Sequence, residues 1–310
     1  MPAEHSTREK PHLSEDGGFE AIAREIAAQI GGDCAPEPQS HVSGGSIHRS
    51  YRWLCGDTPL FVKVADQRGG TGLEAEAAGL MELAGAQAVR VPRVRARGSI
   101  GRSAFLALEW IESRPAGRAA EHRLGEQLAA QHRVTAARFG FATDNFIGRT
   151  RQPNACLDDW TEFFRERRLR QQLELAVQSG FAELLEEPGA RLLDSMDALL
   201  AGHQPQASLL HGDLWAGNWL ADEHDEPVIF DPAVYYGDRE ADLAMTRLFG
   251  GFGRAFYDAY RTAAPLPAGH AVRAELYNLY HVLNHANLFG GGYARQARAS
   301  IDRLLAEVRG

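Results

Sequence analysis

The sequence contains few cysteines and no long apolar run. Its three cysteines, Cys34, Cys55 and Cys156, are odd in number and far apart, which fits neither a disulfide framework nor a zinc cluster and favours a reducing compartment. No apolar run approaches the roughly 20 residues needed to cross a bilayer, and residues 1–18 contain no apolar stretch of the signal-peptide type. We therefore expect a cytoplasmic protein that does not span a membrane, with a flexible tail over residues 1–18.

The sequence also has no excess of positive charge. Lysine and arginine number 33 against 41 aspartates and glutamates, which gives a formal net charge of −8. Nothing therefore draws the whole protein toward phosphate backbones, and we expect no nucleic-acid partner. The arginines of RERRLR (165–170) are mixed into a helical pattern, and we expect them on a solvated helix face. The 44% hydrophobic and 24% charged content is that of an ordinary globular protein.

The pattern of the sequence changes along the chain. Residues 19–30 have isoleucines at helical spacing, and a β-rich stretch follows, with strands over 47–54 and 60–65 around a turn at 56–57. A helix over 71–86 and a strand over 104–111 come next, and long helices over 121–138, 158–184 and 189–201 occupy the rest. We predict an α+β fold of two lobes, a small β-rich lobe over 19–111 and a larger helical lobe over 112–310.

A lysine and a glutamate in the smaller lobe fit a nucleotide site. Lys63 lies in the strand LFVKVA, where a solvated edge lysine is the simpler interpretation. Glu76, however, falls within the apolar stripe of the next helix, and a carboxylate on a buried face needs a partner. A strand lysine paired with a helix glutamate fixes the lysine on nucleotide phosphates in protein-kinase-like folds. A phosphate loop would lie just before the first strand, where the sequence has either that loop or a plain turn at Ser43, Gly44, Gly45 and Ser46.

The larger lobe contains HGDLWAGNW (211–219), followed by VIFDPA (228–233). Asp213, Asn218 and Asp231 have the order and spacing used for phosphoryl transfer. The Asp213 carboxylate can accept or orient a hydroxyl proton, and the oxygens of Asn218 and Asp231 are hard ligands suited to Mg²⁺. Each residue alone fits an ordinary turn or cap. Together with Lys63 and Glu76 in this chain order, they predict phosphoryl transfer that depends on a nucleotide and Mg²⁺.

These motifs resemble those of the fructosamine kinase (ketosamine 3-kinase) family, a branch of the aminoglycoside-phosphotransferase-like proteins with a protein-kinase-like fold. The resemblance covers about residues 43–293, including SGGSIHRSYRW, LFVKVA, LEAEAAGLMEL, FLALEWI and LLHGDLWAGNW. The catalytic run is shared with aminoglycoside, choline and homoserine kinases. DPAVYYGDREADLAMTRLFGGF and LNHANLFGGGY are more specific to fructosamine kinases. Some relatives have cysteine where this chain has Ser46, so a thiol switch at that loop is not expected here.

The resemblance implies a role for each matching position. Asp213 is similar to the catalytic base, Asn218 and Asp231 to the magnesium ligands, and Lys63 to the lysine on the ATP phosphates with Glu76 as its partner. Three further elements are implied: a phosphate loop at Ser43, Gly44, Gly45 and Ser46, a hinge that receives adenine at Glu109, Trp110 and Ile111, and a brace of the catalytic loop at Asp242.

Candidate substrate residues lie near the C-terminus and in the catalytic loop. His281, Asn284 and His285 share one side of a predicted helix, and the two histidines are four residues apart. With no glutamate between them and no third ligand, we do not expect zinc. These histidines either pack in the core or bind sugar hydroxyls, and Trp215 either packs or stacks on a substrate. The family resemblance favours the substrate role for all of them.

The resemblance implies phosphorylation of the sugar 3-hydroxyl of a ketosamine, either free or formed on a protein lysine, and hence protein deglycation. One alternative is a kinase for an aminoglycoside or a choline-like amine. Its expected dense acidic surface is not evident in the C-terminal helix, which offers histidine and asparagine. Another alternative is a nucleotide-binding module without turnover, but Lys63, Asp213, Asn218 and Asp231 are all intact.

Overall fold

The computed structural model describes residues 15–42, 48–66 and 69–308, which form two compact units. The first unit comprises the chain up to Glu74 together with Val94–Trp110, and the second comprises Ala75–Arg93 and Ile111–Gly310. The proposed phosphate loop at Ser43, Gly44, Gly45 and Ser46 lies outside the described residues.

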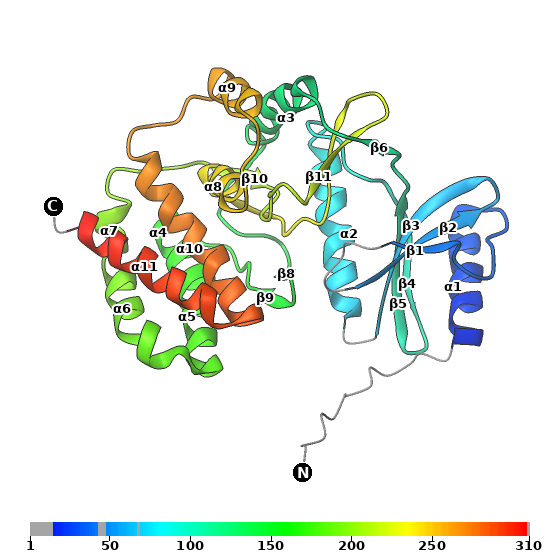
Figure 1. Cartoon of the computed structure of the whole chain (residues 1–310), viewed down its shortest axis with the longest axis horizontal. Helices are drawn as coiled ribbons and strands as arrows, with labels where there is room; N and C mark the ends of the chain where they lie inside the picture. Colours follow the sequence, from blue (N-terminus) through cyan, green and yellow to red (C-terminus); the bar gives the residue numbers. More distant parts are fainter. Residues whose placement is uncertain (1–14, 43–47, 67–68, 309–310) are drawn as a thin grey trace, which may run out of the picture. The chain divides into compact units, whose positions relative to one another are not determined.

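The first unit is a five-stranded antiparallel sheet with a helix on one face (Figure 1). The strand order is β1-β2-β3-β5-β4. The helix α1 starts four residues before the predicted position, so the predicted tail is too long by those four. The elements of the first unit are α1 (Glu15–Ile30), β1 (Ser40–Val42), β2 (Arg49–Cys55), β3 (Thr58–Asp66), β4 (Val94–Ile100), β5 (Ser103–Glu109) and the start of α2 (Gly70–Gly85).

Alternation of apolar residues along the strands builds the core of this unit. In β3, Leu60, Val62 and Val64 face Ile22 and Ile26 of α1 within one buried cluster. The predicted turn at 56–57 is confirmed, since it joins β2 directly to β3. Gly56 in this turn has a positive φ, which favours glycine. β3 is the central strand of the sheet, and its residues from Val62 to Ala65, which alternate between the two faces, are all buried.

The expectation that the cysteines form no disulfide is wrong for two of them. Cys34 and Cys55 are bonded, although 21 residues separate them in sequence. The segment after α1 runs antiparallel to the end of β2, where the Ala35 N–H donates to the Leu54 carbonyl at 2.9 Å, and this pairing brings the two sulfurs together. Cys156 is a free thiol. Because disulfides are typical of oxidising compartments, the cysteines do not support a reducing one.

The second unit consists mainly of helices around one large apolar core. The helices α10 and α11 pack side by side, and α3 packs against α9 (Figure 1). The unit begins with the rest of α2. Its further helices are α3 (Arg118–Gln131), α4 (Trp160–Phe164), α5 (Gln171–Ala176), α6 (Ala182–Asp194), α7 (Met196–Leu199), α8 (Glu240–Leu248), α9 (Arg254–Ala263), α10 (His270–Phe289) and α11 (Gly291–Glu307).

All three of the predicted long helices are shorter than expected or interrupted. The helix expected over 121–138 ends at Gln131, because Thr135 and Ala136 instead form strand β7 and pair with β10. The region expected as one helix over 158–184 contains two π-helical segments, Arg165–Arg170 and Val177–Phe181, and kinks at Gly180 with φ of +92°. The helix expected over 189–201 is divided between α6 and α7. The early end of the first helix depends on the pairing of β7 with the distant strand β10 (Ala207–Leu210), whereas the kink lies at an exposed glycine.

The arginines of the first π-helical segment do not all face solvent. Arg168 is completely buried, and its guanidinium stacks over the Tyr235 ring with 4.0 Å to the ring centroid. Its Nη1 and Nη2 donate to the Pro153 carbonyl and to Asn154 Oδ1, at 2.7 Å and 2.8 Å. The prediction of a solvated face is therefore wrong for Arg168, because aromatic rings and backbone oxygens take the place of water around its charge.

Short strands of the second unit hold the functional loops. They form a three-stranded sheet β13-β10-β7, a three-stranded sheet β12-β11-β6 and a β8-β9 hairpin. Among the described residues, no helix is long and apolar enough to cross a membrane. The strands are β6 (Ser113–Arg114), β7 (Thr135–Ala136), β8 (Asn145–Ile147), β9 (Thr150–Gln152), β10 (Ala207–Leu210), β11 (Trp219–Asp222), β12 (Pro227–Ile229) and β13 (Tyr235–Gly237).

Candidate active site

The loop that carries Asp213 begins directly after β10 and is anchored by His211. The His211 side chain is fully buried, and its Nε2 donates to the Phe230 carbonyl at 2.9 Å. Its Nδ1 accepts the Asp213 backbone N–H at 3.2 Å, so the ring is held as the neutral Nε2-H form. Burial lowers the pKa of His211. The His211 carbonyl also accepts the Ala233 N–H at 2.8 Å, which ties this loop to the segment after β12.

Gly212 is required by the backbone between His211 and Asp213. Its φ is +83°, in the left-handed region that disfavours other residues. A Cβ built there would overlap the carbonyl oxygen of Ala233. A glycine therefore lets the loop turn sharply while it lies against the segment that contains Asp231.

Asp242 of α8 holds the same loop from beneath. Its carboxylate accepts the backbone N–H groups of His211 and Gly212, at 2.7 Å and 2.8 Å, and lies 3.2 Å from His132 Nε2. Burial alone would raise the pKa of Asp242, but the hydrogen bond and charge of His132, with the contribution of His211 and the Gly212 N–H, lower it. The carboxylate is thus ionised at neutral pH, with donors on several sides. This geometry matches the brace that the sequence predicts at Asp242.

Asp213 and Asn218 lie together in the loop. Asn218 Nδ2 donates to the Asp213 carbonyl at 2.9 Å and approaches Asp213 Oδ2 at 3.3 Å. Since the amide nitrogen is turned toward Asp213, the amide oxygen points away from it. The Asp213 side chain is 23% exposed. Its pKa is raised well above the usual value by burial and, next, by the negative charge of Asp231.

Asp231 is placed by the segment that follows β12. The strand ends at Ile229, so Asp231 lies beyond its end. Its φ of +56° is in the left-handed region, which is uncommon for a residue with a side chain. The charges of Asp231 and Asp213 oppose each other, and this repulsion is what a divalent cation would relieve.

Two of the predicted substrate residues adjoin Asp213. His281 Nδ1 is 4.0 Å from Asp213 Oδ1, too far for a hydrogen bond, and it finds no hydrogen-bond partner among the described residues. Burial, with a smaller effect of His285, lowers the pKa of His281 to about 3, so the contact is no ion pair at neutral pH. Trp215 is 37% exposed, and its ring lies over Gly217.

The other two candidates on α10 have different surroundings. Asn284 is buried, and its amide lies 3.4 Å from both Gln172 Nε2 and the Ile147 carbonyl, so its position is explained by packing. The His285 ring is half-buried, donates through Nδ1 to the His281 carbonyl at 2.8 Å and contacts the Phe249 ring. His285 therefore borders the site, whereas Asn284 supports the helix from inside.

The predicted nucleotide residues lie in both units. Lys63 is buried in the central strand β3, with only 6% of its surface exposed, so it is not a solvated edge lysine. Glu76 is half-buried on α2, whereas Glu74 is exposed and pairs with Arg97 at 3.5 Å. Because Lys63 and Glu76 belong to different units, their pairing stays a prediction. At the proposed hinge, Glu109 ends β5, Trp110 contacts the Phe61 ring, and Ile111 begins the longer segment of the second unit.

Comparison with known families matches residues 18–307 to the family described as fructosamine kinase. The chain is 43% identical over 288 residues to a probable ketoamine kinase of Synechocystis sp., covering 93% of this chain and 97% of the relative. It is 39% identical over 271 residues to the chloroplastic protein-ribulosamine 3-kinase of Arabidopsis thaliana, covering 86% and 82%. The chain belongs to the fructosamine kinase family. The protein is an ATP-dependent phosphotransferase that acts on ketoamines.

Solved structures agree with this family. A crystal structure of a protein assigned as a fructosamine-3-kinase, from Haemophilus somnus, has a TM-score of 0.84 at 27% identity and covers 92% of this chain and 96% of its own. The aminoglycoside phosphotransferase APH(4)-Ia has a TM-score of 0.63 at 15% identity, with 93% and 99% covered, which shows a shared fold alone. The predicted α+β, kinase-like fold is therefore confirmed.

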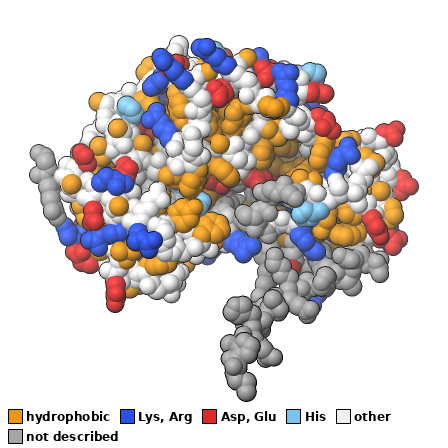
Figure 2. Space-filling view, in the orientation of Figure 1, with side chains coloured by type: hydrophobic (Ala, Val, Ile, Leu, Met, Phe, Trp, Pro, Cys, Tyr) orange, Lys and Arg blue, Asp and Glu red, His pale blue; other side chains and the backbone are white. Residues whose placement is uncertain are grey.

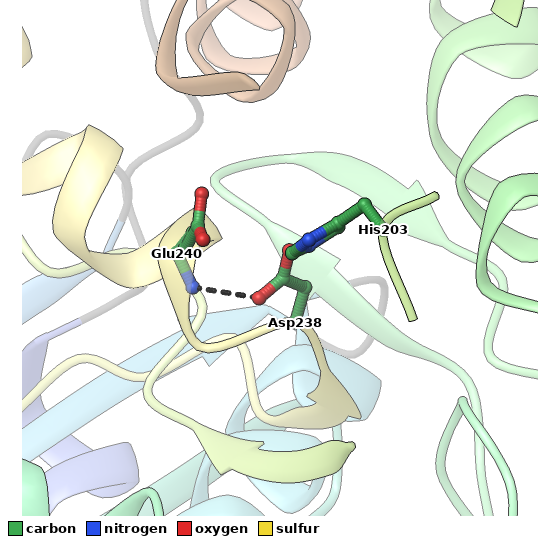
Figure 3. Close-up of side chains that lie close together, drawn as sticks. All are labelled: His203, Asp238 and Glu240. Atoms are coloured by element: carbon green, nitrogen blue, oxygen red, sulfur yellow. Dashed lines mark hydrogen bonds and ion pairs between the residues drawn. The ribbon is translucent and has the colours of Figure 1, made fainter. Parts of the chain in front are cut away.

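The kinase also contains a buried polar cluster at the start of α8, formed by His203, Asp238 and Glu240 (Figure 3). Three such ligand types could hold a metal ion, but other donors already satisfy them. Asp238 accepts from His203 Nε2 and from the Tyr277 hydroxyl, both at 2.6 Å, and from the Glu240 N–H at 3.0 Å. Arg273 pairs with both oxygens of Glu240, at 2.8 Å and 2.9 Å. The cluster therefore fixes α8, and with it Asp242.

The sequence pattern did not reveal the importance of His132 in this fructosamine kinase. His132 follows the end of α3, is 110 positions from Asp242 in sequence, and has no motif around it. Its Nδ1 lies 2.8 Å from the Tyr260 hydroxyl, so the brace continues from Asp242 to α9. A lone histidine after an amphipathic helix carries no signal for this role, because its partners come from distant parts of the chain.

Proposed function

We propose that Asp213 is the base of this kinase and acts on the 3-hydroxyl of a ketosamine sugar. The Asp213 carboxylate accepts a hydrogen bond from the sugar hydroxyl and orients its oxygen toward the γ-phosphorus of ATP. It accepts the proton as the new P–O bond forms and the bond from the γ-phosphorus to the bridging oxygen breaks, with ADP as the leaving group. Its position is supported by the hydrogen bond that its backbone N–H donates to His211 Nδ1 and by the one that its carbonyl accepts from Asn218 Nδ2. Catalysis then depends mainly on positioning and charge, since phosphoryl transfer requires little covalent work from the protein.

The acceptor hydroxyl would lie between Asp213 and His281. A hydroxyl there bonds both Asp213 Oδ1 and His281 Nδ1, and it supplies the partner that this buried nitrogen lacks among the described residues. A buried polar atom without a partner costs about 1–3 kcal/mol, so filling this position favours binding. Because His281 is neutral, it orients the hydroxyl without opposing the proton transfer to Asp213.

Magnesium is the cation that fits Asn218 and Asp231. An amide oxygen turned away from Asp213 and a neighbouring carboxylate are the hard donors that Mg²⁺ takes, with phosphate and water completing its shell. When bound, Mg²⁺ neutralises the charge that develops on the transferred phosphoryl group. Asn218 and Asp231 then serve to hold it, and Asn218 also keeps Asp213 in place.

Residues of both units would bind the nucleotide. Lys63, with Glu76 as its partner, holds the ATP phosphates, and the backbone of Glu109, Trp110 and Ile111 receives adenine. Ser43, Gly44, Gly45 and Ser46, the proposed phosphate loop, lie outside the described residues. The burial of Lys63 in the central strand supports this role, since a lysine held by its strand is already oriented for a phosphate.

The acceptor is a fructosamine or ribulosamine, on a free amine or a protein lysine, and the reaction leads to deglycation because the 3-phosphate is unstable. The names of the relatives support this class. We also propose a cytoplasmic location, which cell fractionation with immunodetection would test.

The observation that carries the proposal is the contact of Asp213 with Asn218 and His281 in one loop-and-helix site. The test is phosphate transfer from ATP to ribulosyl-lysine, fructosyl-lysine, kanamycin and choline by the wild type and Asp213→Asn. We expect transfer to the ketosamines alone, its loss in the variant, and its dependence on added Mg²⁺. Transfer only to kanamycin or choline would refute the acceptor, and unchanged transfer by Asp213→Asn would refute the base.

A further inference from the structure

Five aromatic side chains form a continuous strip on the second unit, from the Asp213 loop to α11. Trp215 meets Phe249 edge-on at a centroid distance of 6.3 Å, and Phe249 lies 4.7 Å from the His285 ring. His285 in turn contacts Phe289 at 5.5 Å and Tyr293 at 5.1 Å. We call these five residues the aromatic strip.

The strip is exposed where most aromatic residues of this unit are buried. Phe289 is 63% exposed and Trp215 is 37% exposed, and these are two of the four large hydrophobic residues found exposed in the described parts of the chain. Hydrophobic side chains gather on the surface over the C-terminal end of α10 (Figure 2). An exposed apolar cluster of this kind marks a binding surface more often than chance placement does.

The strip is continuous with the proposed catalytic position. Trp215 follows Asp213 by two residues in the same loop, and His281, which adjoins Asp213, lies one turn before His285 on α10. Eight residues of helix separate His281 from Phe289, a rise of about 12 Å. The strip thus leads from the acceptor hydroxyl along α10 to the surface.

The ligand that suits this surface is an amine with an apolar substituent. Four of the five side chains in the strip are tryptophan, phenylalanine or tyrosine, and burial lowers the pKa of the fifth, His285, which favours its neutral form. In a ketosamine the amine nitrogen lies a few bonds from the sugar 3-hydroxyl and is a secondary ammonium at neutral pH. Aromatic rings attract such a cation through their faces and gain further from burying the apolar group attached to it.

We propose that the aromatic strip binds the substituent on the amine nitrogen of the ketosamine and selects substrates whose substituent is apolar or aromatic. The inference rests on the proposed function, because it requires the sugar to lie at Asp213. Sugar recognition then belongs to Asp213 and His281, and amine recognition to the strip, with Phe289 and Tyr293 at its outer end.

Two synthetic substrates with the same sugar separate these parts. Fructosyl-ethylamine and fructosyl-phenethylamine share the sugar and the ammonium and differ in the phenyl ring. We expect the wild type to have a kcat/KM at least about tenfold higher for the phenethyl substrate, the effect of burying most of one ring. Phe289→Ala and Tyr293→Ala are expected to remove most of this preference and to change kcat/KM for the ethyl substrate by less than about twofold.

The matched control is Val308→Ala, which shortens another exposed apolar side chain, outside the strip. Val308→Ala should leave kcat/KM unchanged for both substrates. The proposal is wrong if the wild type has the same kcat/KM for the two substrates, or if Phe289→Ala lowers kcat/KM equally for both. It is also wrong if Phe289→Ala changes the molecular mass in sedimentation and leaves the preference intact, since the strip is then a contact between copies of the chain. Failure of the ethyl substrate itself would overturn the proposed function, and this inference with it.

Discussion

Asp242→Asn is the most informative single change, because one carboxylate supports the whole catalytic loop. Asp242 accepts two backbone N–H groups and faces His132, and both side chains are only 1% exposed. Asparagine offers one oxygen in place of two, so its NH₂ group must face one of these donors. A buried donor left without an acceptor costs about 1–3 kcal/mol, and each remaining bond loses about 1 kcal/mol with the charge. We expect a loss of about 3–5 kcal/mol in the free energy of unfolding.

The same change should reduce turnover more than binding. The loop that Asp242 holds carries Asp213, and a displacement of about 1 Å at a reacting group can cost about 100-fold in rate. We expect kcat for a ketosamine to fall by about 10–100-fold with little change in KM. Urea unfolding and steady-state kinetics measure the two effects on the same preparation.

The effect of pH gives a further check on Asp242. Its pKa is lowered in the folded protein, so the ionised carboxylate stabilises the fold above the unfolded pKa near 4, and this contribution is lost as the pH falls through the lower folded value. Asp242→Asn should therefore lose less stability than the wild type on acidification. The control is Asp302→Asn, the same change at an exposed aspartate that pairs with Arg298 on the surface of α11. If Asp242→Asn unfolds at the same urea concentration as the wild type, the brace does not act as described.

Three further changes test other parts of the site. Gly212→Ala adds a Cβ that overlaps Ala233 and strains a positive φ, so we expect at least about 2 kcal/mol less stability in urea unfolding, and an unchanged midpoint would refute the close approach. His281→Gln removes a histidine with a folded pKa of about 3, below the unfolded 6.5, so the unfolded state binds more protons between these values. Between pH 7.5 and 5, the free energy of unfolding should therefore fall by about 2 kcal/mol less in this variant than in the wild type. An equal fall in both proteins would contradict a buried neutral ring. Arg273→Met leaves Glu240 buried without its partner and should lower the free energy of unfolding by about 3–5 kcal/mol. The double variant Arg273→Met with Glu240→Gln should lower it by less. Equal losses in thermal or urea unfolding would show that the pair is not coupled.

Local sequence determined the backbone and the chemistry of the site. The glycine at 212 and the spacing of Asp213 and Asn218 within one loop involve residues a few positions apart, so the catalytic loop could be predicted from a short stretch of sequence. The same holds for Lys63 on a strand and for the turn at 56–57, where alternation and turn residues specify the backbone. The family motifs extended this reading to most of the chain.

Tertiary structure decided which side chains meet across long distances in sequence. The Cys34–Cys55 disulfide, the complete burial of Arg168 and the link from His132 to Asp242 each join segments that no local spacing relates. The position of Asn284 in the packing of α10 rather than at its surface was also set there. The physical reason is that hydrophobic periodicity specifies which face of an element is buried, whereas the partner on that face depends on how all the elements pack.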